Sequence, residues 1–177
     1  MLYPTKEWDR IAAENNNRRT IFLRFVAPLL CLTAIATIIG TWLATPRELY
    51  SAGFVIFKIF HLCISISAGL FFSAFVITEI MAHQVDQRDH NRSFALMAYA
   101  SGAAFLVIFI VEMFPFFNEL LVLAFYSCYL YWRGIPHLIQ VSGQKQMIYT
   151  LLSFIIMVLI FSLTFFFFGK ILGTIFL

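Results

Sequence analysis

Four acidic or imidazole side chains recur at helical spacing in one stretch of the chain, namely Glu79, His83, Asp86 and His90. Steps of four, three and four residues place them on one face if the chain continues there as a single helix. A divalent metal such as zinc accepts two imidazoles and two carboxylates, and His137 offers a third imidazole from a later segment. The same groups are also typical of a solvated helix end that pairs with Arg133 in a structural ionic clamp. We favour the clamp, keep metal binding as the alternative, and assign no metal and no other cofactor.

A second set of polar residues lies within or beside apolar sequence: Lys58, His61, Glu112, Asn118 and Glu119. A charge in hydrocarbon costs about 2.5–3.5 kcal/mol on insertion scales, so such residues usually have partners or functions. Lys58 and His61 are three residues apart and share a helical face. We expect Lys58 to pair with Glu112 or Glu119 as a polar clamp between helices. An ion or substrate pathway along the face of Lys58 and His61 is the alternative.

These groups are carried by five apolar runs, at residues 25–43, 54–80, 94–111, 114–132 and 148–168. Each run is long enough to cross a bilayer, which needs about 20 predominantly apolar residues. The composition, 62% hydrophobic and 12% charged, is far from the globular norm of about 45–50% and 25%. The sequence therefore predicts an all-α, polytopic membrane protein in which residues 25–177 form a bundle of five transmembrane helices.

Small and helix-breaking residues add local expectations. Ser65, Gly69 and Ser73 form a small-residue stripe that allows close approach of another helix. Gly134 and Pro136 predict that the fourth helix ends in a turn there.

Basic residues are distributed unequally between the joints. Nine of the 12 lysines and arginines fall before the first run, between the second and third, or between the fourth and fifth. If five spans exist, these nine lie on one side, and Arg47, Lys58 and Lys170 lie on the other. The positive-inside rule then places the N-terminus in the cytoplasm and the C-terminus outside.

Residues 1–24 form a separate amphipathic segment with a cytoplasmic location. Trp8, Ile11 and Ala12 fall on one helical face, which predicts a short helix lying in the headgroup layer. Trp8 would anchor this interfacial helix. A basic cluster of Arg18, Arg19 and Arg24 would face anionic lipid. The attraction would contribute about 1 kcal/mol of binding free energy per basic residue.

Several motifs in this order resemble the Yip family of Rab-interacting membrane proteins, in its bacterial branch. They are P-T-K-E-W-D-R-I-A-A-E (4–14), F-V-A-P-L-L (25–30), M-A-Y-A-S-G (97–102), M-F-P-F-F-N (113–118), Y-S-C-Y-L-Y-W-R-G-I-P (126–136) and Q-K-Q-M-I-Y-T (144–150). The resemblance covers nearly the whole chain. Where family members often carry a proline after the tyrosine of the third motif, this chain has Gly102 and Ala103.

The resemblance implies a non-enzymatic membrane protein that organises membrane or binds partner proteins, and its bacterial branch implies the plasma membrane, a bacterial inner membrane, as the location. Family members bind Rab GTPases largely through a long cytosolic N-terminal region, and about two dozen residues precede the first run here. Rab binding is therefore not expected. We expect the lipid bilayer, further copies of the chain or other membrane proteins as partners, and no nucleic acid. The alternatives are a small transporter or channel with a polar path along the second span and, third, a metal-dependent membrane protein. The sequence has no H-E-x-x-H, phosphate-loop or G-x-S-x-G pattern.

Overall fold

The structure is a computed structural model that describes residues 4–14, 16–45, 51–85, 89–139 and 144–176. Within these ranges the secondary structure is helical and no strand occurs. In chain order the helices are α1 (Pro4–Glu14), α2 (Arg18–Ile21), η1 (Phe22–Val26), α3 (Ala27–Ala44), α4 (Ala52–Val85), α5 (His90–Ala100), α6 (Gly102–Met113), η2 (Pro115–Phe125), α7 (Tyr126–Leu138) and α8 (Gln144–Phe176).

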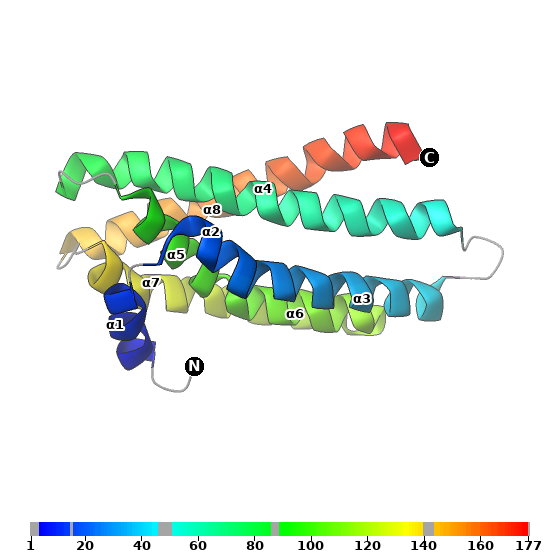
Figure 1. The fold of residues 1–177 in the computed structure, drawn as a ribbon, viewed down its shortest axis with the longest axis horizontal. Helices are drawn as coiled ribbons and strands as arrows, with labels where there is room; N and C mark the ends of the chain where they lie inside the picture. Colours follow the sequence, from blue (N-terminus) through cyan, green and yellow to red (C-terminus); the bar gives the residue numbers. More distant parts are fainter. Residues whose placement is uncertain (1–3, 15, 46–50, 86–88, 140–143, 177) are drawn as a thin grey trace.

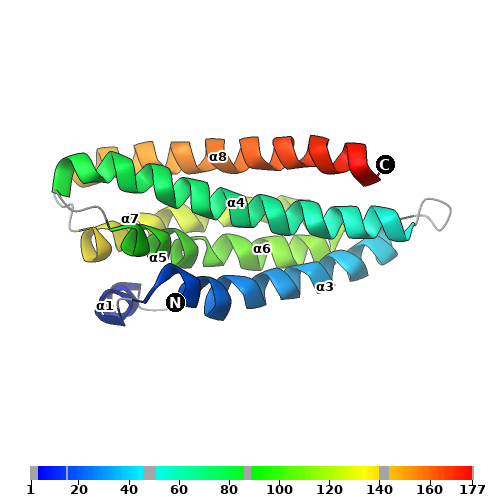
Figure 2. The same cartoon turned by 45° about the horizontal axis from the view of Figure 1, so that its top comes forward.

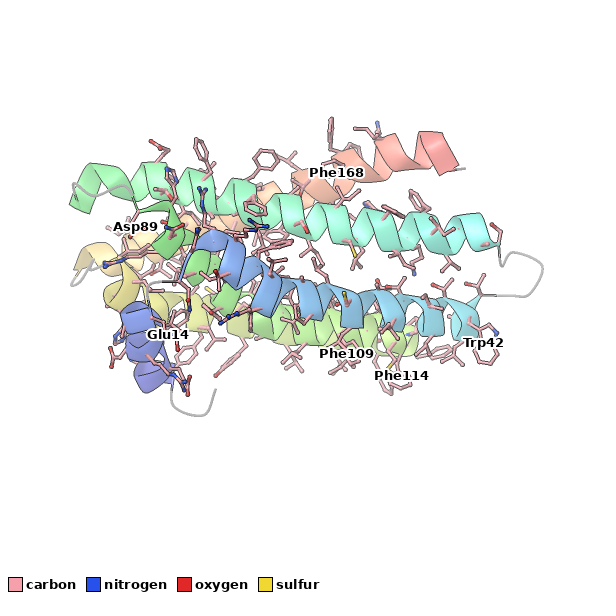
Figure 3. The ribbon with its side chains drawn as sticks, viewed as in Figure 1. Glu14, Trp42, Asp89, Phe109, Phe114 and Phe168 are labelled. Carbon is pink, nitrogen blue, oxygen red and sulfur yellow. The ribbon has the colours of Figure 1, made fainter. Side chains whose placement is uncertain are left out.

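The long helices lie side by side along one axis, and α1 lies across one end of the bundle (Figure 1). From that end, α3 runs to the opposite end, α4 returns, α5 and α6 run out together, η2 and α7 return, and α8 runs out again (Figures 1 and 2). We call the two ends the α1 end and the far end. Glu14 and Asp89 lie at the α1 end, whereas Trp42 and Phe114 lie toward the far end (Figure 3).

Among the described residues, three helical segments are long and apolar enough to cross a membrane: Arg18–Ala44, Ala52–Ile80 and Thr150–Ile171. A fourth is formed if α5 and α6, which meet at an angle of 41°, count as one bent span. The fold is therefore an all-helical membrane protein with three or four candidate spans. The fourth predicted span, residues 114–132, corresponds to η2 and the first half of α7, where the helix is divided into a 3₁₀ part and an α part.

The bend between α5 and α6 lies at Ser101, without a proline. A break in a membrane helix frees backbone N–H groups that need another partner, because lipid cannot supply one. Ser127 of α7 provides that partner, since its hydroxyl oxygen accepts a hydrogen bond from the N–H of Ala104 at 3.1 Å. The bend is thus stabilised by the neighbouring helix.

The predicted turn at Gly134 and Pro136 is wrong, because α7 continues through both residues to Leu138. Pro136 lies inside α7, two residues before its end, where it removes one backbone hydrogen bond to the preceding turn without ending the helix. Gly134 is buried, and a Cβ there would lie 2.5 Å from Leu96 Cδ1 and 2.9 Å from Trp8 Cζ2. The glycine therefore serves close packing of α1 and α5 on α7.

Small residues also set the packing of the long helices. Ser65, Gly69 and Ser73 are buried on α4, and a Cβ at Gly69 would lie 2.7 Å from the Phe161 ring of α8. On the other side of the bundle, a Cβ at Gly40 of α3 would overlap the backbone carbonyl oxygen of Glu112 on α6. Both pairs of helices therefore approach closely through positions without bulky side chains.

Candidate functional site

The best-defined polar site joins three helices and contains Lys58 of α4, Glu112 of α6 and Thr37 of α3. The Nζ atom of Lys58 lies 3.6 Å from Oε2 of Glu112, and the two side chains are 33% and 21% exposed. The hydroxyl of Thr37, a fully buried residue, lies 3.1 Å from the same oxygen and can donate to it. Of the two partners that the sequence predicts for Lys58, the structure brings Glu112 into contact.

The position of Thr37 follows from a stripe of small polar residues on α3. Thr33, Thr37 and Thr41 are buried at spacings of four residues, with Gly40 beside them. The Thr33 hydroxyl donates to the Leu29 carbonyl at 2.6 Å, which satisfies its polar group within the helix. Thr37 was not predicted from the sequence as part of this site. Its spacing from Thr33 and Thr41 was the signal that could have identified this face.

His61 lies one turn further along α4 and contacts α8 instead of the lysine–glutamate pair. Its Nε2 atom lies 2.7 Å from the carbonyl oxygen of Phe165, so Nε2 must carry the proton that is donated. The ring also packs on Phe165 and Phe57, with centroids 4.2 and 5.7 Å away. A Cβ at Gly169 would lie 3.1 Å from Nε2, so the glycine makes room for the imidazole. His61 therefore joins α4 to α8.

Beside the pair runs an open groove of about 700 Å³, which we call the lateral groove. It is lined by Leu62, Ser65, Ile66, Ile108, Val111, Glu112, Asn118, Leu121, Phe161, Ser162 and Phe165. Helices α4 and α8 form one wall, and α6 with η2 forms the other. Leu121 and Phe165 are 46% and 55% exposed on apolar helix surfaces, so the groove opens toward the lipid.

The two remaining far-end residues of the predicted set are exposed on η2. Asn118 faces the lateral groove, whereas Glu119 does not line it. Phe117 has φ −102° and ψ 37°, which interrupts the helix just before them. This short turn places Asn118 near Glu112, which precedes it on α6.

The cluster from Glu79 to His90 does not form one helical face, which corrects the interpretation of its spacing. Helix α4 ends at Val85, and α5 begins at His90 after Asp89, whose backbone is extended. The Asp89 carboxylate caps the new helix by accepting hydrogen bonds from the N–H groups of Asn91 and Arg92. His90 stacks on Phe75, with centroids 5.8 Å apart. The side chain of His83 and all of Asp86 lie outside the described residues.

His137 contacts α1 instead of that cluster. Its Nδ1 atom lies 2.7 Å from Oδ1 of Asp9. Arg133, on the same helix, is exposed. Within the described ranges, no three histidine, cysteine, aspartate or glutamate side chains are grouped so as to hold a metal ion.

Trp8 does not anchor α1 in lipid, which corrects a second expectation. The side chain is 1% exposed, because the apolar face of α1 packs on α7 and α5 around Gly134 and Leu96. The amphipathic pattern was identified correctly, but the apolar face covers protein. Three basic residues of the predicted membrane-facing cluster are exposed: Arg18, Arg19 and Arg24.

The family of this chain follows from its match to a known family model. The family model of the Yip1 domain matches residues 1–166. The chain belongs to the Yip1 domain family. No curated protein and no solved structure is detectably similar to it. In this Yip1 domain the match runs from α1 into α8, so the Lys58–Glu112 pair, the lateral groove and the Asp9–His137 contact all lie within the family region.

Proposed function

We propose that this Yip1 domain is a non-enzymatic membrane protein that crosses the plasma membrane five times and organises the membrane or partner proteins at its cytoplasmic end. The α1 end is the cytoplasmic one in this proposal. The segments at that end carry most of the described basic residues: Arg10, Arg18, Arg19, Arg24, Arg92 and Arg133. The positive-inside rule supports this orientation.

Exposed tryptophans support the placement in the bilayer. Trp42, near the end of α3, is 66% exposed, and Trp132, in the second half of α7, is 46% exposed. Trp42 lies toward the far end (Figure 3), whereas α7, which carries Trp132, lies toward the α1 end (Figure 1). Tryptophan is enriched at both membrane interfaces, so the two rings mark levels between which the five passes would cross the hydrocarbon.

The single observation that carries the organising role is the way α1 is fixed across the cytoplasmic end. Trp8 is buried beneath it, and Asp9 contacts His137 at 2.7 Å. In this proposal α1 lies at headgroup level, held there by its packing on the bundle and not by insertion of its own apolar face, and it occupies area in one leaflet and none in the other. Such an asymmetric element favours membrane that curves toward the other leaflet, and it forms a rigid polar surface for a partner.

The proposal is tested with purified protein, labelled at the C-terminus, in giant vesicles from which narrow membrane tubes are pulled. Molecules whose α1 end faces outward should be enriched in the tube relative to a lipid dye. Trp8→Ala removes the buried side chain that fixes α1 on the bundle, and it should abolish this enrichment. Phe166→Ala, at a position 63% exposed on α8, is the matched aromatic control and should keep it.

Both variants are first checked for helix content and monodispersity. Equal enrichment of wild type and Trp8→Ala would contradict the role of α1. The topology is tested separately, with reporters fused before residue 1 and after residue 177. Reporters found on one side of the membrane would contradict the five-span arrangement.

A transport role is the second candidate, because Glu112 lines a groove of about 700 Å³ beside α4. Against it, both Lys58 and His61 are engaged with protein partners, at 3.6 and 2.7 Å. Vesicles with a trapped pH dye or a trapped potassium dye distinguish the two roles. A flux that depends on Glu112 would favour transport.

A further inference from the structure

One buried hydroxyl in the wall of the lateral groove lacks the partner that its burial demands. Ser65 is 2% exposed and lines the groove, and its Oγ atom has no hydrogen-bond partner among the described residues. A buried polar group without a partner costs about 1–3 kcal/mol. Because Oγ itself is enclosed, Ser65 donates a hydrogen bond to an acceptor in the groove only after its side chain rotates to another rotamer.

The groove contains further polar groups at its far end, where Glu112 and Asn118 face it. The contacts of Glu112 with Lys58 and Thr37 both fall on Oε2. Within the described part of the chain no donor contacts Oε1 of Glu112, so this oxygen can accept a hydrogen bond. Asn118 is exposed and can donate through its amide. The site therefore offers an anion, a nearby cation and two neutral donors.

Apart from Ser162, the rest of the groove is apolar. Its walls consist mainly of Leu62, Ile66, Ile108, Leu121, Phe161 and Phe165. A volume of about 700 Å³ lies within the range of about 300–1,000 Å³ that is typical of small-molecule sites. Because the groove opens toward lipid, its occupant must have an apolar chain as well as a polar head.

We infer that the lateral groove binds one phospholipid with a zwitterionic headgroup that carries a primary ammonium. The ammonium is complementary to Oε1 of Glu112, and the phosphate to the Lys58 ammonium and the Asn118 amide. The ester carbonyl, which lies deeper in the groove than the phosphate, accepts a hydrogen bond from the Ser65 hydroxyl. An anionic headgroup would match Lys58 but would oppose Glu112. This inference does not depend on the role of α1, because no residue of the α1 end lines the groove.

The test is native mass spectrometry of the detergent-purified protein with phosphatidylethanolamine, phosphatidylglycerol and phosphatidylcholine of identical chains. We expect phosphatidylethanolamine to be retained best. Phosphatidylcholine has no N–H to donate to Glu112, and hydrogen bonds to charged groups correspond to a loss of about tenfold or more in affinity.

Four variants localise the binding without disturbing the Lys58–Glu112 pair. Ser65→Ala removes the donor in the wall, and Leu121→Trp fills the groove from an exposed position. Both should weaken binding of phosphatidylethanolamine severalfold. Glu119→Gln and Val122→Trp are the matched controls, because neither residue lines the lateral groove, and both should bind as wild type.

Two results would overturn the inference. One is equal retention of the three lipids that Leu121→Trp does not reduce. The other is loss of a dimer in Leu121→Trp with lipid binding unchanged, which would assign the groove to a second copy of the chain.

Discussion

Gly40 is the position at which one added methyl group should separate two helices. A Cβ there would overlap the Glu112 carbonyl oxygen, and it would lie 2.9 Å from the Glu112 carbonyl carbon and 3.2 Å from the Met113 oxygen. All three atoms are backbone atoms of α6. They cannot rotate aside as a side chain would, so α3 and α6 must move apart in Gly40→Ala.

The size of the effect follows from two opposing terms. Overpacking a tightly packed position costs about 1–3 kcal/mol, and the overlap with backbone places Gly40→Ala at the upper part of that range. Alanine is favoured over glycine within a helix by about 1 kcal/mol. The net loss is about 2 kcal/mol. A domain of about 150–250 residues loses about 2–4 °C per kcal/mol, so the melting temperature should fall by about 4–8 °C.

The assay is thermal unfolding in detergent, followed by fluorescence-detected size exclusion. Gly53→Ala is the matched control, because its Cβ would meet only the Ser51 hydroxyl oxygen, at an ordinary 3.6 Å. Its melting temperature should stay the same or rise. If Gly40→Ala and Gly53→Ala have the same melting temperature, the inferred close approach of α3 and α6 is wrong. A smaller penalty of Thr37→Ala in the Gly40→Ala background would show that separation also weakens the Thr37–Glu112 contact.

Two further predictions concern the polar contacts of α4. Lys58→Met should destabilise the protein by about 1–2 kcal/mol. Breaking a fully buried ion pair costs about 3–5 kcal/mol, and the cost is smaller here because the Lys58 side chain is 33% exposed. Adding Glu112→Gln should restore much of the lost stability, as measured by thermal unfolding. A double variant as unstable as Lys58→Met would refute the pairing. His61→Leu removes the hydrogen bond to the Phe165 carbonyl, which should lower the free energy of unfolding by about 0.5–1.5 kcal/mol. It should also speed amide hydrogen exchange in α8 near Phe165. His61→Gln keeps a donor and should exchange more slowly than His61→Leu; the reverse order would contradict the contact.

The positions of the helices could be predicted from the sequence because apolar runs and polar joints alternate sharply. Residues 25–43 and 54–80 lie within Arg18–Ala44 and within α4. The division of the fourth run into η2 and α7 was not predicted, since length and hydropathy are the same for a 3₁₀ and an α segment. The 41° bend at Ser101 depends on Ser127 from another helix, which hydropathy does not report.

The Lys58–Glu112 contact could be predicted from the sequence because a charged side chain in hydrocarbon needs an oppositely charged partner, and few candidates exist. The arrangement near His90 was not. The spacing of Glu79, His83, Asp86 and His90 fits one helix, but Asp89 is also a strong N-cap residue, and capping by Asp89 starts a new helix. The Asp89 carboxylate accepts hydrogen bonds from two backbone N–H groups, and this local capping decides where the helix begins, whatever the spacing of the four residues.

Trp8 shows why the partner of an apolar face is harder to predict than the face itself. Lipid and protein interior are both apolar, so hydrophobic periodicity does not distinguish them. Small residues carry more information, because a glycine can accept a ring from another helix. In this structure the rings of Phe161, Phe25 and Trp8 would lie within 2.7, 2.9 and 2.9 Å of a Cβ at Gly69, Gly102 and Gly134. Each of these contacts joins two different segments of the bundle, α4 with α8, η1 with α6, and α1 with α7. With 22 phenylalanines and 8 glycines in the chain, pairing of aromatic rings with glycines specifies which helices meet where hydropathy alone leaves the choice open.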